Sequence, residues 1–505
     1  MLSLHDVRPL HPSGNGIKLF SHVRMPTIRI LNTLSGTKEP LPETGKRPLR
    51  LFVCGPTVYD YIHIGNARTN AVFDTFARYV RSRGIKLFYL ENITDIDDKI
   101  IRRAAEEKSD WKKLARTYEH AFREDMKKLN IRSVTKYARA TSFIKEIVQQ
   151  VQTLAQKGHT YEIPDGWYFD LTTFPNYGKL AKRTVEEAED GISRIDENPE
   201  KRNRGDFCLW KLTNVKTKNA HDAKKKFAVI DGVPAWNTPL GWGRPGWHIE
   251  DTAITESQFG PQYELHGGGV DLIFPHHEAE IAQQESASGK KPFVKLWMHV
   301  AFFDLKGAKM SKSAGNIITV RDFLKIHDAN VFRMIVAEHH YRTRIEYDET
   351  LATQAENALR TFHEFLEKLR FVERLAGQNT HFRTDAACNR SARAFDDAMA
   401  DDVNTPRALA ALFELINEIQ PYLWTLSRSG AKTISSFIRE RLAIFGIVLL
   451  LKTVPPRIQR LATRRESFRV HKQFMHADAL RRQIETLGYT VEDTPLGPLV
   501  LKKLP

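Results

Sequence analysis

The sequence predicts an α/β fold in which a parallel-sheet domain is split by an insertion and followed by a helical bundle and a small C-terminal domain. Two observations predict it. Short apolar runs alternate with helical patterns on both sides of an irregular, charged stretch at 161–234, which is typical of a parallel sheet with one interruption. From Val320 onward, apolar residues recur every three or four positions, which predicts helices.

Changes in pattern divide the chain into segments. Residues 1–24 are basic and lack the apolar core of a secretory signal. They fit a disordered tail, a working start at Met25 or a mitochondrial presequence. The segments that follow are the first half of the α/β domain (25–150), the insertion (151–235), the second half (236–319), a connecting region (320–375), a helical bundle (376–455) and a small basic domain (456–505).

Composition narrows the class of protein. The chain has 505 residues, of which 41% are hydrophobic, so several packed domains are expected rather than disorder. A formal net charge of +15 favours a polyanionic partner. The three cysteines, Cys54, Cys208 and Cys388, are too few for a disulfide framework and indicate a reducing compartment such as the cytoplasm. No apolar run approaches the ~20 residues of a membrane span.

The stretch from Leu49 to Arg68 reads as strand, loop and helix. An apolar run ends at Val53, Cys54 begins a loop with glycine and proline, and a helical pattern starts after His63. In a parallel sheet this order puts Cys54 and His63 at the carboxyl edge, where ligands bind, and a helix N-terminus is an anion site. Taken singly, Cys54 would be a small core residue and His63 a structural one.

A second motif, Lys309-Met-Ser-Lys-Ser313, lies far downstream in the same split domain. Two lysines three positions apart in a loop with glycine and serine suit the binding of a polyphosphate, because each ammonium group is a point charge for phosphate oxygens. By itself the motif fits any exposed lysine loop. Together with the strand, loop and helix that contain His63, it predicts an ATP site.

With these two motifs the sequence resembles the class I aminoacyl-tRNA synthetases, whose signatures are HIGH and KMSKS. Within that class it is similar to the cysteinyl-tRNA synthetase family over residues 27–503. The stretches that carry this likeness are Phe52–Asp60, Asn92–Lys99, Pro245–Glu250, His266–Gly269 and Phe274–Glu278. The resemblance implies a Rossmann-like catalytic domain that activates L-cysteine with ATP and Mg²⁺ to cysteinyl-adenylate. The second step that the resemblance implies is transfer of the cysteine from the adenylate to tRNA(Cys). The resemblance also implies that the enzyme is a cytoplasmic monomer.

The resemblance also implies roles for individual residues. His63, Asn66, Lys309 and Lys312 would be catalytic, the lysines by stabilising charge on the leaving pyrophosphate. ATP would contact Thr57, His63, Gly65, Asn66, Gly267, Gly268, Gly269, Asp271, Lys309, Met310, Ser311, Lys312 and Ser313. Gly65 would let adenine lie against the backbone, and Asp271 would accept from ribose hydroxyls. Asn66 stands where the motif usually has its last histidine, so adenylation is expected to survive at a lower rate.

Selection of cysteine is the most specific implication. An apolar pocket separates cysteine from serine poorly, and the family uses a zinc ion held by two cysteines, a histidine and a glutamate. Those positions fall here on Cys54, Asp251, His276 and Glu280, with His276 and Glu280 on one helical face. Asp251 replaces a cysteine, so one zinc is expected in a harder site with a single thiolate. The alternative is that Asp251 only forms hydrogen bonds and no zinc binds.

Gly55, Thr94 and Trp247 match family positions that line the cysteine pocket, although Thr94 and Trp247 also suit a packing role. The helices after 320 and the basic tail resemble the portions of the family that contact tRNA. Two other functions stay open at this point. One is a ligase that passes activated cysteine to a small amine, and the other is a non-catalytic RNA-binding relative.

Overall fold

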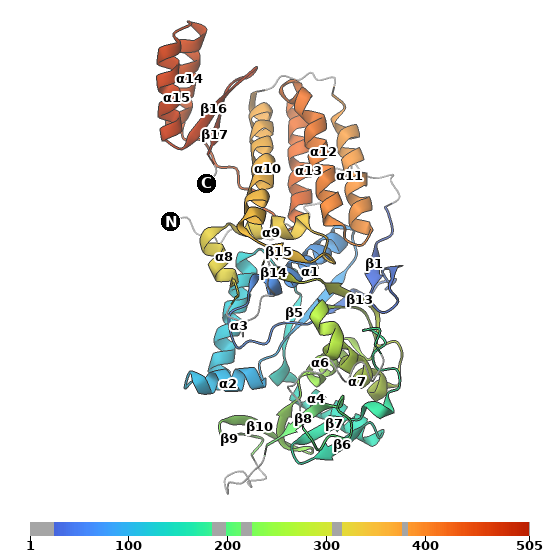
Figure 1. Ribbon diagram of the computed structural model, residues 1–505. Helices are drawn as coiled ribbons and strands as arrows, with labels where there is room; N and C mark the ends of the chain where they lie inside the picture. Colours follow the sequence, from blue (N-terminus) through green and yellow to red (C-terminus); the bar gives the residue numbers. More distant parts are fainter. Residues whose placement is uncertain (1–24, 184–197, 214–224, 306–315, 376–381, 504–505) are drawn as a thin grey trace.

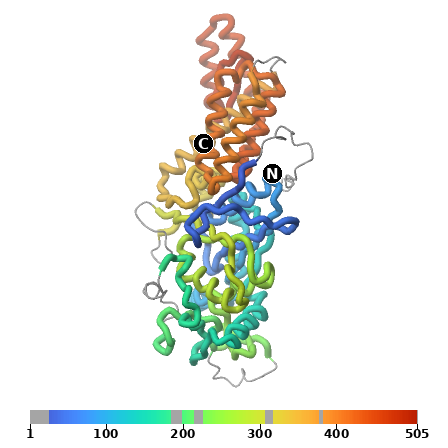
Figure 2. Tube along the Cα trace, turned by 90° about the vertical axis from the view of Figure 1, so that its right-hand side faces the viewer, coloured from blue at the N-terminus to red at the C-terminus, as the bar shows by residue number. Residues whose placement is uncertain are grey.

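The computed structural model describes residues 25–183, 198–213, 225–305, 316–375 and 382–503. The predicted extension 1–24 and the loop Lys309–Ser313 lie outside these ranges. The α/β part and the insertion fill the lower half of Figure 1, and a bundle of long helices stands above them. Figure 2, turned by 90°, shows the same elongated arrangement. Within the described residues, no helix is both long enough and apolar enough to span a membrane.

A five-stranded parallel sheet forms the centre of the α/β part, in the order β13-β12-β3-β4-β5. The first half of the domain supplies β3 (Leu49–Val53), β4 (Leu87–Ile93) and β5 (Lys136–Arg139). The second half supplies β12 (Tyr263–Gly269) and β13 (Val294–Val300), and β12 pairs in parallel with β3. The predicted parallel sheet, split by an insertion, is therefore confirmed.

Helices cover both faces of this sheet, because successive strand residues point to opposite sides. Leu51 and Val53 pack in one core with α1 (Ile64–Ser82) and α3 (Trp111–Lys128). Phe52 packs in a second core. The helices of that second core are α4 (Ile144–Gln156), α6 (Ile249–Phe259) and α7 (Glu278–Ser288), and α2 (Asp98–Glu106) follows β4.

Two further sheets lie outside the parallel sheet of the α/β part. Near the start of the described chain, β1 (Arg29–Asn32) pairs with β2 (Thr37–Pro40) in a two-stranded ribbon. The irregular, charged stretch contains a six-stranded antiparallel sheet. Its strands are β6 (Thr160–Ile163), β7 (Gly166–Phe169), β8 (Phe207–Leu212), β9 (Phe227–Ile230), β10 (Val233–Thr238) and β11 (Gly241–Pro245). The pairings of β7 with β8 and of β8 with β11 join strands that lie far apart in sequence, so the pattern of the chain did not indicate one sheet.

The remainder is helical, as predicted. A parallel pair, β14 (Phe303–Leu305) and β15 (Ile345–Tyr347), connects it to the sheet domain. Its helices are α8 (Val320–Ile326), α9 (Ala329–Glu338), α10 (Glu349–Leu375), α11 (Thr384–Ala400), α12 (Thr405–Ile419) and α13 (Arg428–Ile444). The last unit has α14 (Pro456–Val470), α15 (Phe474–Thr486), β16 (Tyr489–Thr494) and β17 (Gly497–Lys502), and lies beside α10 in Figure 1.

One apolar core runs from the parallel sheet into the helical bundle. A buried ion cluster lies at their junction. Arg333 of α9 is 1% exposed, and its guanidinium donates to Asp74 of α1 (2.6 Å) and to the carbonyl of Phe445 (2.6 Å). Asp74 also accepts from Arg78 (2.7 Å) and from the backbone N–H of Ser133 (2.9 Å). The cluster therefore joins α1, which begins at the sheet edge, to the bundle.

Glu91 in β4 predicts a measurable pH dependence of stability. Its side chain is fully buried and accepts from Asn70 (3.0 Å), and burial raises its pKa to about 8. The folded state therefore keeps this proton when the unfolded state has lost it, so stability falls as pH rises from about 5 to 8. The decline in the free energy of unfolding amounts to up to about 1.4 kcal/mol per pH unit. We expect Glu91→Gln to remove it.

Urea unfolding at pH 5, 6, 7 and 8 checks this expectation. Glu346→Gln, at an exposed position of β15, is the matched control and should keep the wild-type slope. Parallel stability curves for the wild type and Glu91→Gln would show that Glu91 is ionised in the folded protein.

Candidate active site

The carboxyl edge of the parallel sheet, between β3 and β12, carries the candidate site. The chain leaves β3 toward β4 on one side, and β12 and β13 lie on the other, so strand order reverses here. Ligands of open α/β sheets bind at this point. Cys54 directly follows β3, and its backbone N–H donates to the carbonyl of Gly267 in β12 (3.1 Å). Cys54 is thus fixed where the two halves of the domain meet.

The four side chains predicted as zinc ligands come together at this edge. Asp251 lies in the first turn of α6, Glu280 in the first turn of α7, and His276 in the turn just before α7. Nε2 of His276 lies 3.0 Å from a carboxylate oxygen of Asp251 and 3.0 Å from one of Glu280. Sγ of Cys54 lies 3.8 Å from Oε1 of Glu280. One donor atom from each residue lies within 4.8 Å of the other three.

The chemistry of this group suits a divalent cation. Asp251 and Glu280 are at most 1% exposed, and Oδ1 of Asp251 and Oε2 of Glu280 have no hydrogen-bond partner among the described residues. Burial raises the pKa of Glu280 to about 7, and burial together with the charge of Glu280 raises the pKa of the Cys54 thiol. Burial alone would lower the pKa of His276, but Glu280 and Asp251 raise it to about 9. Buried anions need a counter-charge, and a metal ion would supply it.

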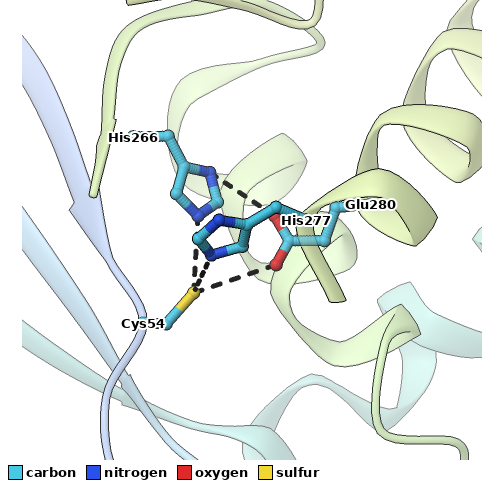
Figure 3. A group of neighbouring side chains, drawn as sticks. All are labelled: Cys54, His266, His277 and Glu280. Atoms are coloured by element: carbon cyan, nitrogen blue, oxygen red, sulfur yellow. Dashed lines mark hydrogen bonds and ion pairs between the residues drawn. The ribbon is translucent and has the colours of Figure 1, made fainter. Parts of the chain in front are cut away.

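A second group shares two of these residues. Cys54, His266, His277 and Glu280 also place one donor atom each within 4.8 Å of the others, and Figure 3 shows them converging between β12 and α7. The sequence had offered no ligand role for His266 or His277. Both His276 and His277 are buried, at 2% and 0% exposed. The only feature of the sequence that could have pointed to His266 as a ligand is its position immediately before Gly267–Gly269.

The predicted cysteine-pocket residues surround the Asp251 group. The Trp247 ring stacks on the His276 ring, with centroids 4.3 Å apart and planes inclined by 17°. The Thr94 hydroxyl donates to Glu250, which is 1% exposed. The backbone N–H of Gly55 donates to Oδ1 of Asn92 (2.5 Å), and a Cβ at Gly55 would lie 1.9 Å from the carbonyl oxygen of Asn92. Only glycine fits at position 55 without moving the end of β4.

The residues predicted for ATP lie around the start of α1. His63 is the N-cap residue of α1 and makes no side-chain cap, and Asn66 is exposed in the first turn. The backbone N–H of Ile64 donates to the carbonyl of Ile318 (3.0 Å), and that of Val320 donates to the carbonyl of Ile62 (3.1 Å). The chain that follows the predicted lysine loop therefore pairs with the His63 segment. Lys309, Met310, Ser311, Lys312 and Ser313 themselves lie outside the described residues.

The glycines at this edge have packing reasons of their own. A Cβ at Gly267 would lie 2.1 Å from the Phe73 ring of α1, and one at Gly268 would lie 2.9 Å from the His277 ring. A Cβ at Gly65 would lie 2.8 Å from the carbonyl oxygen of Phe303. These contacts are enough to explain why glycine stands at positions 65, 267 and 268, whether or not a nucleotide binds there. Gly269 ends β12 at the same edge, and Asp271, which is exposed, lies in the short helical turn that follows.

A cavity of about 90 Å³ lies between the sheet edge and the insertion. Lys211 of β8 and Arg244 of β11 face each other across adjacent strands, and both form ion pairs with Asp98 (2.8 Å for Lys211). Thr57 and Trp247 line the same cavity. The insertion therefore forms one wall of the candidate site, which the sequence had not indicated.

Comparison with known proteins shows which family this chain is similar to. A model described as "tRNA synthetases class I (C) catalytic domain" matches residues 41–357, and one described as "DALR domain" matches residues 394–450. A cysteine–tRNA ligase of Caldicellulosiruptor saccharolyticus is 37% identical over 94% of this chain and 99% of its own length. One of Thermococcus gammatolerans is 38% identical over 93% of this chain and 98% of its own.

Solved structures agree on the fold. Methionyl-tRNA synthetase of Mycobacterium tuberculosis, in complex with methionyl-adenylate, superposes with a TM-score of 0.58 at 16% identity, covering 79% of this chain and 90% of that one. The LeuRS of Agrobacterium radiobacter K84, in a ternary complex with tRNA and LeuAMS, superposes with a TM-score of 0.60 at 10% identity. That match covers 80% of this chain and 84% of the other.

Proposed function

Because this chain belongs to the cysteine–tRNA ligase family of class I aminoacyl-tRNA synthetases, we propose that one zinc ion, held by Cys54, Asp251, His276 and Glu280, selects its substrate. The family's reaction activates L-cysteine with ATP and joins it to tRNA(Cys), and this is the activity of the chain. Nothing in the comparisons supports transfer of cysteine to a small amine, and the relatives are cysteine–tRNA ligases along nearly their whole length.

The convergence of Cys54, Asp251, His276 and Glu280 on one point carries the zinc proposal. When bound, zinc would distinguish a thiolate from an alcohol, because sulfur is much the better zinc ligand. Asp251 supplies an anionic oxygen where the family usually has a second thiolate, so the ligand set keeps its charge. Trp247, stacked on His276, holds that imidazole in place and closes one side of the pocket. Gly55 and Thr94 would line the rest.

For the activation step we propose positioning and charge neutralisation by the chain's own groups. The cysteine carboxylate attacks the α-phosphorus of ATP, and pyrophosphate leaves. The first turn of α1, with His63 and Asn66, would face the phosphates, and Mg²⁺ would accompany them. Lys309 and Lys312 would stabilise the charge on pyrophosphate. The pairing of residues 318–320 with residues 62–64 supports this, because it anchors one end of the lysine loop beside His63.

The tRNA would lie along the helical bundle and the C-terminal unit. Basic side chains of α14, among them Arg460 and Arg464, line a shallow, open depression of the surface. Such groups would give salt-dependent affinity for the phosphate backbone. We also propose a cytoplasmic location, which the low number of cysteines in the sequence favours. The enzyme is expected to act as a monomer.

Metal analysis joined to a specificity measurement tests the zinc proposal. We expect the purified wild type to contain one zinc per chain. We expect Asp251→Ala to lower the preference for cysteine over serine in amino-acid-dependent pyrophosphate exchange by at least roughly 10-fold, whereas Asp251→Cys should keep that preference. Losing a hydrogen-bond partner of a metal ligand already costs about 10–100-fold in metal affinity or activity, and losing a ligand should cost no less. Absence of stoichiometric zinc from the wild type, with Asp251→Ala still charging cysteine, would refute the proposal.

A further inference from the structure

Three arginines surround one buried carboxylate on α3, outside the site described above. Glu119 is 2% exposed, and its carboxylate accepts hydrogen bonds from Arg116, Arg123 and Arg139. We call these four residues the Glu119 cluster. We propose that its three guanidinium groups bind a phosphate of the tRNA backbone in the acceptor arm. The inference rests on the proposed function, because tRNA(Cys) is the polyanion that the cluster would bind.

Glu119 holds the three guanidinium groups in fixed directions. Its Oε2 accepts from Nη1 of Arg116 (2.9 Å) and from Nε of Arg139 (2.7 Å). Its Oε1 accepts from Nε (3.0 Å) and Nη2 (2.8 Å) of Arg123. The Arg123 guanidinium also lies over the Tyr137 ring, 4.3 Å from the ring centroid. Side chains that are ordered in advance lose less entropy when a ligand binds, so the cluster is preorganised for an anion.

The cluster contains more positive charge than its own structure needs. One cation is enough to compensate a buried carboxylate, and Glu119 has three. Even if Asp95, 3.9 Å from Arg116, compensates a second one, the guanidinium groups exceed the carboxylates by one charge. The three arginine side chains are 38–39% exposed, and each carries N–H donors that Glu119 does not use. Because the guanidinium fork matches two oxygens of a phosphate, a phosphate is the expected ligand.

The exposed surface of α3 has the same sign as the cluster. The helix buries two of its carboxylates, those of Glu119 and Asp125. Among its charged residues that are exposed or half-buried, Glu124 is acidic and the others are basic, namely Lys112, Lys113, Arg116, Arg123, Lys127 and Lys128. A helix that buries carboxylates and exposes cations attracts polyanions. This surface therefore favours a nucleic acid as the partner of α3.

The place of the cluster in the sheet points to the acceptor arm of the tRNA. Arg139 is the last residue of β5 and lies in register with Ile93 of β4, directly before Thr94 of the proposed cysteine pocket. The cluster thus stands at the carboxyl edge of the sheet, where the 3′ end of the tRNA must meet the adenylate. In Figure 1, α3 and the C-terminal unit lie on the same side of the molecule. A tRNA that extends from that unit to the sheet edge would pass α3.

Aminoacylation of a tRNA(Cys) transcript by the full chain, measured at several salt concentrations, tests the inference. We expect Arg123→Gln to raise the KM for tRNA about 10-fold, because one charge-assisted hydrogen bond is lost. The slope of log kcat/KM against log salt concentration should become less negative by roughly 0.7–0.9, the change for one phosphate contact. Arg116→Gln and Arg139→Gln should act alike. Cysteine-dependent pyrophosphate exchange, in which tRNA takes no part, should keep its kinetic constants.

Each of these variants leaves Glu119 with two arginines, so the fold should tolerate the change. Lys295→Gln is the matched control, because it also removes one positive charge. Lys295 is exposed near the amino end of β13, and β13 and β5 are the two outer strands of the sheet. The control should leave both the KM for tRNA and the salt slope at their wild-type values.

The alternatives give different results. Equal effects of Arg123→Gln and Lys295→Gln on the KM for tRNA would show that only the overall charge counts, which would overturn the inference. A higher KM for ATP or pyrophosphate, with that for tRNA unchanged, would assign the cluster to small phosphates and overturn it as well. A thermal midpoint and exchange rate that fall together with aminoacylation would show a structural role only. Wild-type protein that does not aminoacylate tRNA(Cys) would overturn the proposed function and the inference with it.

Discussion

Replacing Cys54 with serine is expected to abolish stoichiometric zinc binding and to lower kcat/KM for cysteine-dependent pyrophosphate exchange by more than roughly 100-fold. Loss of a hydrogen-bond partner of a metal ligand already costs about 10–100-fold in metal affinity or activity. Cys54 belongs to both groups of possible ligands, so without Cys54 neither group contains a thiolate. No other position in the described site can replace this sulfur, because Cys208 and Cys388 are buried in other parts of the chain.

Cys208→Ser is the matched control. Cys208 is a buried thiol of the insertion, in contact with Tyr161 and Tyr168, and it belongs to neither ligand group. Its replacement should leave the zinc content at one per chain. Equal zinc content in Cys54→Ser and Cys208→Ser would show that the metal lies elsewhere.

Asp74→Ala is expected to destabilise the protein by about 3–5 kcal/mol, the usual cost of removing one partner from a buried ion pair. The change leaves the guanidinium of Arg333, 1% exposed, without its carboxylate. It also removes the acceptor for the backbone N–H groups of Arg132 and Ser133, each at 2.9 Å. Because the cluster joins α1 to the bundle, cooperative unfolding between these parts should weaken as well.

Urea unfolding monitored by tryptophan fluorescence measures this loss. Lys325→Ala is the control, because it removes an exposed ion pair with Asp322 (2.7 Å, with Lys325 72% exposed) and should change stability by less than about 0.5 kcal/mol. Similar unfolding midpoints for the two variants would mean that the cluster contributes no more than a surface pair.

The main sheet could be predicted from sequence because its strands are short apolar runs followed directly by helical patterns. Val53, Cys54 and His63 sit where that order placed them. The antiparallel sheet of the insertion could not be predicted, because β8 and β11 pair across a charged segment that itself contains β9 and β10. Pairing of that kind depends on tertiary packing rather than on local propensity.

The candidate metal ligands also divide into residues that the sequence indicated and residues that it did not. Cys54, Asp251, His276 and Glu280 were assigned through family resemblance, and the fold then brought them together. His266 and His277 were missed because their role depends on where β12 ends relative to the turn before α7. The second partners of these rings, Tyr263 and His299, lie on strands whose register no local pattern specifies. Only the folded chain shows that five other possible ligands surround the sulfur of Cys54.

The absorption spectrum of the Co²⁺-substituted protein tests thiol selection by the metal most directly. Sulfur bound to Co²⁺ gives a charge-transfer band, and an alcohol does not replace thiolate as a ligand under the same conditions. We expect L-cysteine to intensify this band with a saturable dependence on concentration, and L-serine at the same concentrations to leave it unchanged. A spectrum that does not respond to L-cysteine, in protein that still activates cysteine, would contradict selection of the substrate by a metal-bound thiolate.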